Sequence, residues 1–323
     1  MTDALFRVWR VICVLAGGVG AAKLLRGFEL LGLNEEVVAI VNTGDDDEFY
    51  GLHISPDLDS VTYALAGLSN DELGWGVRDE SYRAMEMLGR LGDDAWFTLG
   101  DRDLGTHLYR TRRLQEGAHL SEVADEIRLA HGIRTSIVPM SDTPVRTMVR
   151  VTTTPESADE MTLRFQEYFV KHRHQPWVRS VSYEGAEGAH VPERAIIALQ
   201  QARLVVIAPS NPVLSIGPLL AINEIRTRLV ERRDSVVAVS PLIGDHALKG
   251  PADANLRALF HESTSATVAS FYLELCRHIL IDPRDAPAAN VIQALGVDVH
   301  TTPTIMQSDD DKIALARWLA EHR

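Results

Sequence analysis

Short runs of apolar residues alternate with amphipathic segments along most of this chain. The apolar runs typical of buried strands fall at 11–15, 37–41, 135–138, 204–208, 236–240 and 278–281. The segments in which apolar residues recur with helical spacing fall at 22–31, 121–131, 192–202, 219–232 and 309–321. Strands that alternate with helices in this way predict an α/β fold, with a mainly parallel sheet and helices on both of its faces.

Two stretches depart from this alternation. Residues 57–117 carry mainly helical patterns interrupted by glycines, and residues 145–169 show longer alternating patterns that predict a β-hairpin. The chain has no internal repeat and no linker rich in proline or serine. The sequence therefore predicts one domain over residues 1–323, in which the helical stretch and the hairpin are elaborations.

The first apolar run ends in a glycine-rich segment, in which Gly17, Gly18 and Gly20 precede a helix that carries Lys23. Glycines allow the backbone to turn sharply and to approach a ligand closely. The N-terminus of the helix that follows directs free N–H groups and a partial positive charge at an anion. This segment predicts a binding site for a phosphorylated ligand, and the alternative is a tight turn kept for packing alone.

The spacing of these glycines differs from two familiar phosphate-binding motifs. A dinucleotide fingerprint reads G-x-G-x-x-G and is followed about 20 residues later by an acidic residue that binds a ribose. Here the segment reads G-G-x-G-x-x-K, and Asn42 follows the next strand. A Walker A motif requires Ser or Thr after its lysine, whereas Leu24 follows Lys23. Both a nicotinamide oxidoreductase and a P-loop enzyme are therefore disfavoured.

The composition limits the choice of partners. The chain has 46% apolar and 24% charged residues and a formal net charge of −13. A polyanion would be repelled over most of such a surface, so we expect neither nucleic acid nor an anionic membrane as a partner. No apolar window approaches the ~20 residues of a membrane span, and residues 1–10 lack a signal-peptide core, which predicts a cytoplasmic protein. A phosphorylated ligand would then need local cations or a metal ion in its pocket.

The segments that follow the predicted strands are rich in small, polar and turn-forming residues. They include 42–47 after the second strand, 139–144 after the third, 209–212 after the fourth and 241–244 after the fifth. Ligands of open parallel sheets bind beyond the carboxyl ends of the strands, so we expect these segments to converge on one anion-binding crevice. Within them, Ser210 and Asn211 offer a hydroxyl and an amide that could contact a ribose or a base edge, although a proline-bounded turn is the alternative.

Two carboxylates near this edge are candidate metal ligands. Asp45 follows the second strand directly, and Asp59 lies in the first turn of a helix that begins near Ser55 and Pro56. Mg2+ takes one or two carboxylates together with waters and phosphate oxygens of the substrate. The alternatives are a solvated acidic turn around Asp45 and, for Asp57, a capping role.

A second acidic segment has two interpretations. Arg102, between Asp101 and Asp103, could clamp a phosphate, or the two carboxylates could mark the start of a helix. His107 follows without a Cys or Ser partner nearby, so we expect a packing or surface histidine. The sequence leaves the function of this segment open.

Taken together and in order, these segments resemble the 2-phospho-L-lactate transferase family (CofD), including its phosphoenolpyruvate-using branch. The segments that carry the resemblance are AGGVG (16–20), NTGDD (42–46), SPDLD (55–59), WG (75–76), LGDRD (99–103), TH (106–107), FQE (165–167), APSNP (208–212) and SPLIG (240–244). They cover most of the chain. No single segment is specific, whereas the ordered set is.

Membership of that family would imply a Rossmann-like fold, a homodimer, Mg2+ as cofactor and one reaction. In this reaction a guanosine diphosphate-linked three-carbon acid, lactyl- or enolpyruvyl-diphosphoguanosine, donates its phosphoacid to the terminal ribityl hydroxyl of the deazaflavin Fo. The products are (dehydro) coenzyme F-420-0 and GMP. The alternative is a non-catalytic nucleotide-sugar-binding regulator of the related gluconeogenesis-factor-like group.

The resemblance also implies contacts with the deazaflavin at the positions of Asp59 and Thr98. We combine it with the residue chemistry into one set of hypotheses. Donor phosphates are assigned to Gly17, Gly18, Gly20 and Lys23, Mg2+ to Asp45 with Asp59, and the guanosine end of the donor to Ser210 and Asn211. Asp59 is also expected to orient or deprotonate the acceptor hydroxyl, which makes Asp59 and Asp45 the predicted catalytic residues.

Overall fold

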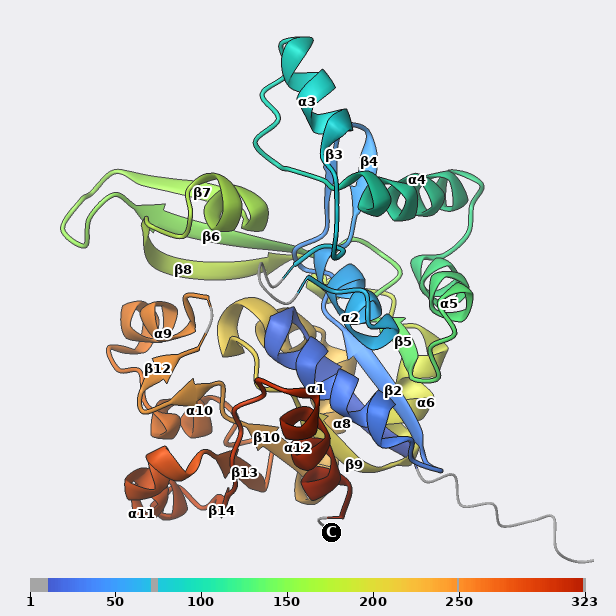
Figure 1. Ribbon diagram of the computed structural model, residues 1–323. Coiled ribbons are helices and arrows are strands. Elements are labelled where there is room, and N and C mark those ends of the chain that lie inside the picture. Colours follow the sequence, from blue (N-terminus) through green and yellow to red (C-terminus); the bar gives the residue numbers. More distant parts are fainter. Residues whose placement is uncertain (1–10, 71–74, 249, 322–323) are drawn as a thin grey trace, which may run out of the picture.

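Seven parallel strands form the central sheet of the computed structural model, which describes residues 11–70, 75–248 and 250–321 (Figure 1). Their order is β14-β13-β10-β9-β1-β2-β5, and every neighbouring pair runs parallel. The strands are β1 (Val11–Ala16), β2 (Glu36–Val41), β5 (Ser136–Pro139), β9 (Ala202–Ile207), β10 (Val236–Val239), β13 (His278–Ile281) and β14 (Asp298–Thr301). The predicted α/β fold with a mainly parallel sheet is confirmed.

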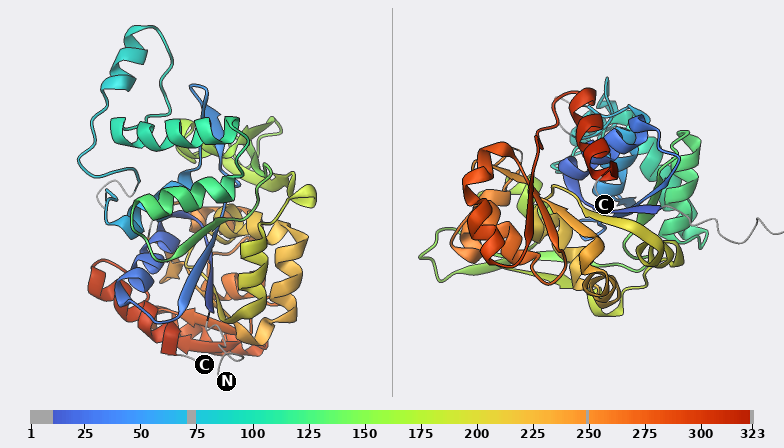
Figure 2. Two further views of the ribbon diagram at one scale, coloured as in Figure 1. Left: turned by 90° about the vertical axis from the view of Figure 1, so that its right-hand side faces the viewer. Right: turned by 90° about the horizontal axis from the view of Figure 1, so that it is seen from below.

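Separate sets of helices cover the two faces of this sheet, which gives the expected Rossmann-like arrangement (Figure 2). Along β1, Ile12 and Val14 pack into one core, whereas Cys13 and Leu15 pack into the other. Because both cores are apolar, the strand has a continuous apolar sequence. The helices on the first face are α1 (Gly18–Leu31), α2 (Pro56–Ala66), α5 (Leu120–Ala130) and α12 (Asp309–Glu321). Those on the second are α6 (Glu193–Gln201), α7 (Gly217–Ala221), α8 (Asn223–Glu231), α10 (Ser265–Phe271) and α11 (Ala289–Ala294).

The predicted helical elaboration combines one core helix with an arm that extends beyond the sheet. α2 packs on the sheet, whereas α3 (Arg83–Arg90) and α4 (Asp101–Gln115) lie above its carboxyl edge in Figure 1. The short hairpin of β3 (Asp47–Phe49) and β4 (Leu52–Ile54) reaches up to the same arm. The arm therefore lies over the edge of the sheet where a ligand is expected to bind.

The predicted hairpin is part of a larger antiparallel sheet. β6 (Arg146–Thr152) pairs with β7 (Glu160–Arg164) as expected, and β8 (Trp177–Glu184) pairs with the other edge of β6. Most side chains of β8 are exposed or half-buried, and the same is true of β14. Neither strand was predicted, because neither carries the apolar run that marks a buried strand.

Several short elements complete the fold. They are α9 (Ala252–Phe260), β11 (Leu242–Ile243), β12 (His246–Ala247), η1 (Glu167–Lys171), η2 (Ala186–Gly188), η3 (Pro212–Ile216), η4 (Arg233–Ser235) and η5 (Pro283–Ala288). Within the described ranges, no helix combines the length and the apolar character that crossing a membrane would require.

Candidate active site

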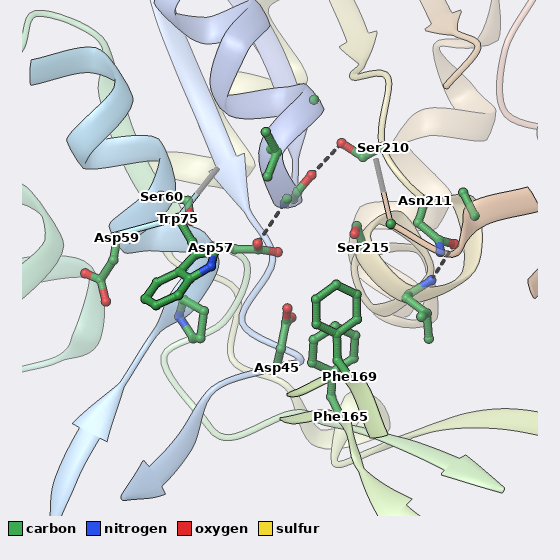
Figure 3. A pocket seen from close by; sticks show the side chains of 18 of the residues that line it. Asp45, Asp57, Asp59, Ser60, Trp75, Phe165, Phe169, Ser210, Asn211 and Ser215 are labelled. Carbon is green, nitrogen blue, oxygen red and sulfur yellow. Dashed lines mark hydrogen bonds between the residues drawn. The ribbon is translucent and has the colours of Figure 1, made fainter. Parts of the chain in front are cut away.

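A cavity of about 870 Å3 opens at the carboxyl ends of β1, β2, β9 and β10 (Figure 3). Its walls come from the turns after these strands, from the start of α2 and from residues 96–99 before α4. Every site residue predicted from the sequence lines it, namely Gly17, Gly18, Gly20, Lys23, Asp45, Asp59, Thr98, Ser210 and Asn211. The glycine segment and the segments 42–47, 209–212 and 241–244 therefore meet at one crevice, whereas none of the described residues that line it comes from 139–144. The role of each residue stays a prediction.

The glycine segment packs closely against the turn after β9. A Cβ atom on Gly20 would lie 2.0 Å from the carbonyl oxygen of Pro209, so only glycine lets α1 approach this turn. Gly18 has a φ of 69°, in the left-handed region that glycine adopts without strain. The Ser210 hydroxyl donates a hydrogen bond to the carbonyl of Gly17. Packing accounts for part of this segment, while the N-terminus of α1 borders the cavity and can bind an anion.

Lys23 brings a positive charge to the wall of the cavity. Its Nζ donates a 2.9 Å hydrogen bond to the carbonyl of Met306, in the segment that leads to α12. This contact fixes the ammonium group at one side of the glycine segment. Binding of a donor phosphate by Lys23 stays a prediction.

Asn42 holds the carboxylates of Asp45 and Asp57 together beneath the glycine segment. Its Nδ2 donates hydrogen bonds to Oδ1 of Asp45 and, at 2.9 Å, to Oδ2 of Asp57. The backbone N–H of Gly44 donates to Asn42 Oδ1 at 2.8 Å and thereby fixes the orientation of the amide. Figure 3 shows Asp45 and Asp57 near one another, whereas Asp59 points away from both. The side chain of Asp57 does not cap α2, which has no side-chain cap hydrogen bond, and instead joins α2 to the end of β2.

Both carboxylates are buried and have raised pKa values. For Asp45, burial is the main cause, and the charges of Asp57 and Asp46 add to it, so the pKa rises well above its usual range. Burial also raises the pKa of Asp57 to about 6, although hydrogen bonds from Asn42 and Gly18 oppose the shift. Such a pair accepts a proton more readily than an exposed carboxylate does, and a cation would relieve the same repulsion.

Asp46 completes this acidic group on the side of β4. Its Oδ2 accepts a 2.7 Å hydrogen bond from the Ser55 hydroxyl and lies 3.2 Å from Nε2 of His53. Among the described residues, Oδ1 of Asp46 is buried and has no hydrogen-bond partner. A buried carboxylate oxygen without a partner is rare and is often explained by a bound ion or water. The oxygen-rich donor set of this region therefore fits a hard divalent cation.

Asp59 belongs to a different group of side chains, which lies between α2 and α4. Nη1 of Arg110 donates to its Oδ2 at 3.1 Å, and Nη2 donates to its Oδ1. His107 lies beside this pair, with Nδ1 3.7 Å from Oδ2 of Asp59 and Nε2 3.2 Å from Oδ1 of Asp103. The hydroxyl of Tyr63 donates to the same Asp103 oxygen at 2.6 Å. All of these groups are buried.

Electrostatic interactions favour the charged forms of Arg110 and Asp103 in this group. Burial alone would lower the pKa of Arg110, but the charge and hydrogen bonds of Asp59 raise it above its usual value. Burial likewise opposes ionisation of Asp103, yet the neighbouring His107 ring, the hydrogen bond from Tyr63 and the charge of Arg110 outweigh it and lower the Asp103 pKa. One ligand atom each from Asp59, Asp103 and His107 lie within 4.8 Å of one another, so these residues could also hold a metal ion. A metal there would have to compete with Arg110 for the Asp59 oxygens.

The structure separates the residues of the LGDRD segment. Arg102 is exposed, donates to the carbonyl of Arg78 and does not line the cavity. Asp101 accepts hydrogen bonds from the Ser81 hydroxyl and the Ala84 amide, so it caps the start of α3. Asp103 faces inward. Of the two interpretations left open by the sequence, the phosphate clamp at Arg102 finds no support in this arrangement.

His107 is the residue that sequence reasoning underestimated. Its side chain is 1% exposed and borders the cavity, so it is no surface histidine. The missed signal is the spacing of Asp103, His107 and Arg110, which places three ionisable residues on one helical face.

An aromatic wall also lines the cavity and was missed. Trp75, Trp96 and Phe97 belong to it, and Phe165 stacks on Phe169 with ring centroids 5.3 Å apart. Figure 3 shows these two phenylalanines next to Asp45. Flat apolar surfaces of this kind suit a planar ring system. Thr98 directly follows Phe97 in the chain and adds a small polar side chain to the lining of the cavity.

Asn211 has a structural role in addition to lining the cavity. Its Oδ1 accepts from the backbone amides of Val213 and Leu214, at 3.0 and 3.1 Å, and so caps η3. Its Nδ2 donates to Oδ1 of Asn255 at 3.0 Å. One amide hydrogen of Asn211 remains for a ligand. The contact with guanosine stays a prediction for both Ser210 and Asn211.

The fold and the cavity define a class of α/β proteins that bind a phosphorylated ligand at the carboxyl edge of a parallel sheet. A family description, "2-phospho-L-lactate transferase CofD", matches residues 12–302. The chain is 43% identical over 310 residues to the 2-phospho-L-lactate transferase of Methanopyrus kandleri, which covers 95% of each chain. It is 40% identical over 314 residues to the phosphoenolpyruvate transferase of Streptomyces griseus, covering 96% of this chain and 97% of that one. The chain belongs to the 2-phospho-L-lactate transferase (CofD) family, and it is a transferase, as the resemblance predicted.

Comparison with solved structures supports the fold independently. A UPF0052 family protein from Bacillus halodurans superposes with a TM-score of 0.61 at 16% sequence identity, covering 97% of this chain and 99% of that one. At this identity the likeness shows a shared fold alone.

Proposed function

We propose that this protein transfers 2-phospho-L-lactate or phosphoenolpyruvate from a guanosine diphosphate-linked donor to the ribityl hydroxyl of the deazaflavin Fo, with release of GMP, in coenzyme F-420 biosynthesis. The names of the relatives from Methanopyrus and Streptomyces support the two candidate groups. The observation that carries the proposal is one cavity bordered by a helix N-terminus, a buried carboxylate pair and an aromatic wall. These features suit a diphosphate, a metal ion and a planar acceptor, respectively.

In this proposal Asp45 and Asp57 hold Mg2+. Carboxylate oxygens are the ligands that Mg2+ prefers, and burial raises the pKa of both residues in a way that a cation would reverse. The sequence pairs Asp45 with Asp59, but both Asp59 oxygens accept hydrogen bonds from Arg110, so we favour Asp57 as the second ligand. When bound, Mg2+ would neutralise charge on the diphosphate oxygens of the donor.

The donor is proposed to lie along the glycine segment. Backbone N–H groups at the start of α1, around Gly17, Gly18 and Gly20, would bind its phosphates, with the charge of Lys23 nearby. The N–H of Gly18 itself is excluded, because it donates to Asp57. The guanosine end would then reach the turn that carries Ser210 and Asn211. This orientation directs the three-carbon acid toward α2 and the aromatic wall.

The acceptor is proposed to lie between the aromatic wall and Asp59. Each Asp59 oxygen keeps a lone pair beyond its bond to Arg110, so it can accept a hydrogen bond from the ribityl hydroxyl. Thr98 offers a hydroxyl to the ring system of the deazaflavin. Asp59 would thus orient the attacking oxygen toward the donor.

Transfer of this kind depends on positioning and charge neutralisation more than on covalent catalysis. The acceptor oxygen forms a bond to the phosphorus that carries the three-carbon acid. The bond from that phosphorus to the bridging oxygen breaks, GMP leaves with this oxygen, and the hydroxyl proton is released. The residues that bind and orient both substrates therefore carry most of the rate enhancement.

The decisive experiment follows GMP release. The purified protein is incubated with Fo, Mg2+ and either lactyl- or enolpyruvyl-diphosphoguanosine, and both GMP and the deazaflavin product are quantified by chromatography. GMP release that requires Fo and stops on chelation of Mg2+ supports the proposal, and the preferred donor identifies the transferred acid. Tight donor binding without consumption of Fo would favour the nucleotide-sugar-binding regulator.

The oligomeric state and the cellular location of the protein are two further predictions. The resemblance implies a homodimer, which light scattering of the purified protein would test. The composition predicts a cytoplasmic location, which fractionation of the native host would test.

A further inference from the structure

The inward face of α4 is built from ionisable side chains. The buried residues of this helix are Asp103, His107 and Arg110, whose spacing places them on one face. A helix face that packs on the interior of a protein is usually apolar. Burial of charged groups costs free energy unless each finds a partner, and an apolar face would pack without that cost. Packing therefore does not explain these ionisable residues, which indicates that they have a functional role at the cavity.

The hydrogen-bond geometry assigns one tautomer to His107. Its Nδ1 lies 3.3 Å from Nη1 of Arg110. A guanidinium group has donors only, so Nδ1 must be the acceptor in this contact. The ring hydrogen is then on Nε2, which lies 3.2 Å from Oδ1 of Asp103 but does not reach hydrogen-bond geometry with it. His107 thus connects the Asp103 carboxylate to the guanidinium that binds Asp59.

Asp103 is itself held at two points. The Tyr63 hydroxyl donates to its Oδ1 at 2.6 Å, and its backbone amide donates to Oε2 of Glu80 at 3.0 Å. Tyr63 lies one turn after Asp59 on α2. The chain of contacts therefore begins and ends on α2 and passes through α4 between these ends.

We propose that His107 is a positioning residue, which accepts a hydrogen bond from Arg110 and so directs the guanidinium onto both oxygens of Asp59. The effect on catalysis rests on the proposed function, in which Asp59 orients the acceptor hydroxyl. Asp59 and His107 border the cavity, while Arg110 does not, so the contact between His107 and Arg110 acts on the acceptor through Asp59. Residues 96–99 line the cavity and lie just before α4 in the chain. The contacts of His107 and Arg110 on α4 are therefore linked to the wall against which the acceptor would lie.

Two matched substitutions separate positioning from general packing. In H107N, the amide oxygen can take the place of Nδ1 and keep the acceptor for Arg110, while the N–H group beside Asp103 is lost. In H107Q, the amide nitrogen can take the place of Nε2 and keep an N–H group beside Asp103, while the acceptor for Arg110 is lost. Both variants replace the ring by a smaller polar group. We expect kcat of H107Q to fall at least about tenfold below that of H107N, since small misplacements near a reaction centre cost up to about 100-fold. Equal kcat values, or the reverse order, would overturn the proposal.

Crystal structures of both variants test the positioning without any turnover. The expected result is a guanidinium that binds both Asp59 oxygens in H107N and not in H107Q. The same contact in both variants, or its loss in both, refutes the proposal even if the wild-type protein releases no GMP. Absence of GMP release from the wild-type protein would instead contradict the proposed function.

Arg110→Lys provides a second route if H107Q fails to fold. Lysine keeps the charge but cannot bind both carboxylate oxygens in one plane. We expect kcat of R110K to lie, like that of H107Q, at least about tenfold below that of H107N. The change in KM for the nucleotide donor should be smaller than the change in kcat. A folded R110K protein with wild-type kcat would refute the positioning role.

Discussion

The backbone amide of Gly18 donates a 2.7 Å hydrogen bond to Oδ1 of Asp57, which joins the N-terminus of α1 to that of α2. A carboxylate is stabilised at the N-terminus of a helix for the same reason that a phosphate is. A donor phosphate bound at the glycine segment would therefore lie close to this negative charge. A divalent cation between the two would remove the repulsion, which is the physical argument for Mg2+ at Asp57.

The raised pKa of Asp57 predicts how stability and Mg2+ binding depend on pH. The pKa is about 6 in the folded protein against 3.8 for an unperturbed Asp, so the folded state binds this proton more tightly. Its contribution to stability is complete below about pH 4 and is lost as the pH rises through about 6. Mg2+ requires the ionised carboxylate, so the increase in Tm caused by Mg2+ should grow over the same range. Thermal unfolding with Mg2+ or with a chelator, from pH 5 to pH 8, measures both effects.

Asp57→Asn is the control for this prediction. The amide cannot ionise, so the increase in Tm caused by Mg2+ should be small and nearly independent of pH around 6. An unchanged response to Mg2+ in this variant would place the ion elsewhere, and the group of Asp59, Asp103 and His107 would be the next candidate.

Asp57 and Asp59 show how much of the fold and of the site could be predicted from the sequence. The apolar runs predicted six of the seven central strands, because a strand buried on both faces is apolar throughout. The glycine segment and Asp45 followed from the position of the turns at the carboxyl edge. Two residues apart on a helix, however, Asp57 and Asp59 point in different directions. Which of them faces the glycine segment depends on how α2 packs against α1 and α4, and no local pattern carries that information.

Gly20 should be required for the stability of the fold. A Cβ at this position would lie 2.0 Å from the carbonyl oxygen of Pro209, so Gly20→Ala must move α1 away from the turn after β9. We expect a loss of about 1–3 kcal/mol in the free energy of unfolding, which urea denaturation followed by circular dichroism would measure. Gly105→Ala in α4 is the matched control, because its Cβ would meet nothing within 4 Å. That substitution should stabilise the helix by about 0.5–1 kcal/mol. Equal midpoints for Gly20→Ala and the wild type would refute the packing argument.

Asp59→Asn should abolish most of the activity and also destabilise the protein. Loss of the group that orients the acceptor should lower kcat by about 100-fold or more. The buried Arg110 would lose its partner, which costs about 3–5 kcal/mol in other buried ion pairs. In the double variant Asp59→Asn, Arg110→Met, both charges are gone, so stability should recover in part while kcat stays low. GMP release and urea denaturation separate the two effects. Wild-type kcat in a folded Asp59→Asn protein would show that another residue orients the acceptor.

Substitutions of Asn211 test whether a residue with a structural role also binds the donor. Its Oδ1 caps η3 and its Nδ2 binds Asn255, which leaves one amide hydrogen for a ligand. Asn211→Asp keeps the capping oxygen but loses the hydrogen bond to the buried Asn255, whereas Asn211→Ala loses both and should cost about 1 kcal/mol more. If the remaining hydrogen contacts the guanosine end, Asn211→Asp should raise KM for the donor and leave KM for Fo unchanged. Because the donor is anionic and the new carboxylate repels it, the rise in KM should shrink at high salt if charge alone is responsible and persist if a hydrogen bond is lost. A donor KM equal to that of the wild type would restrict Asn211 to capping and leave Ser210 as the remaining side chain of this turn for guanosine.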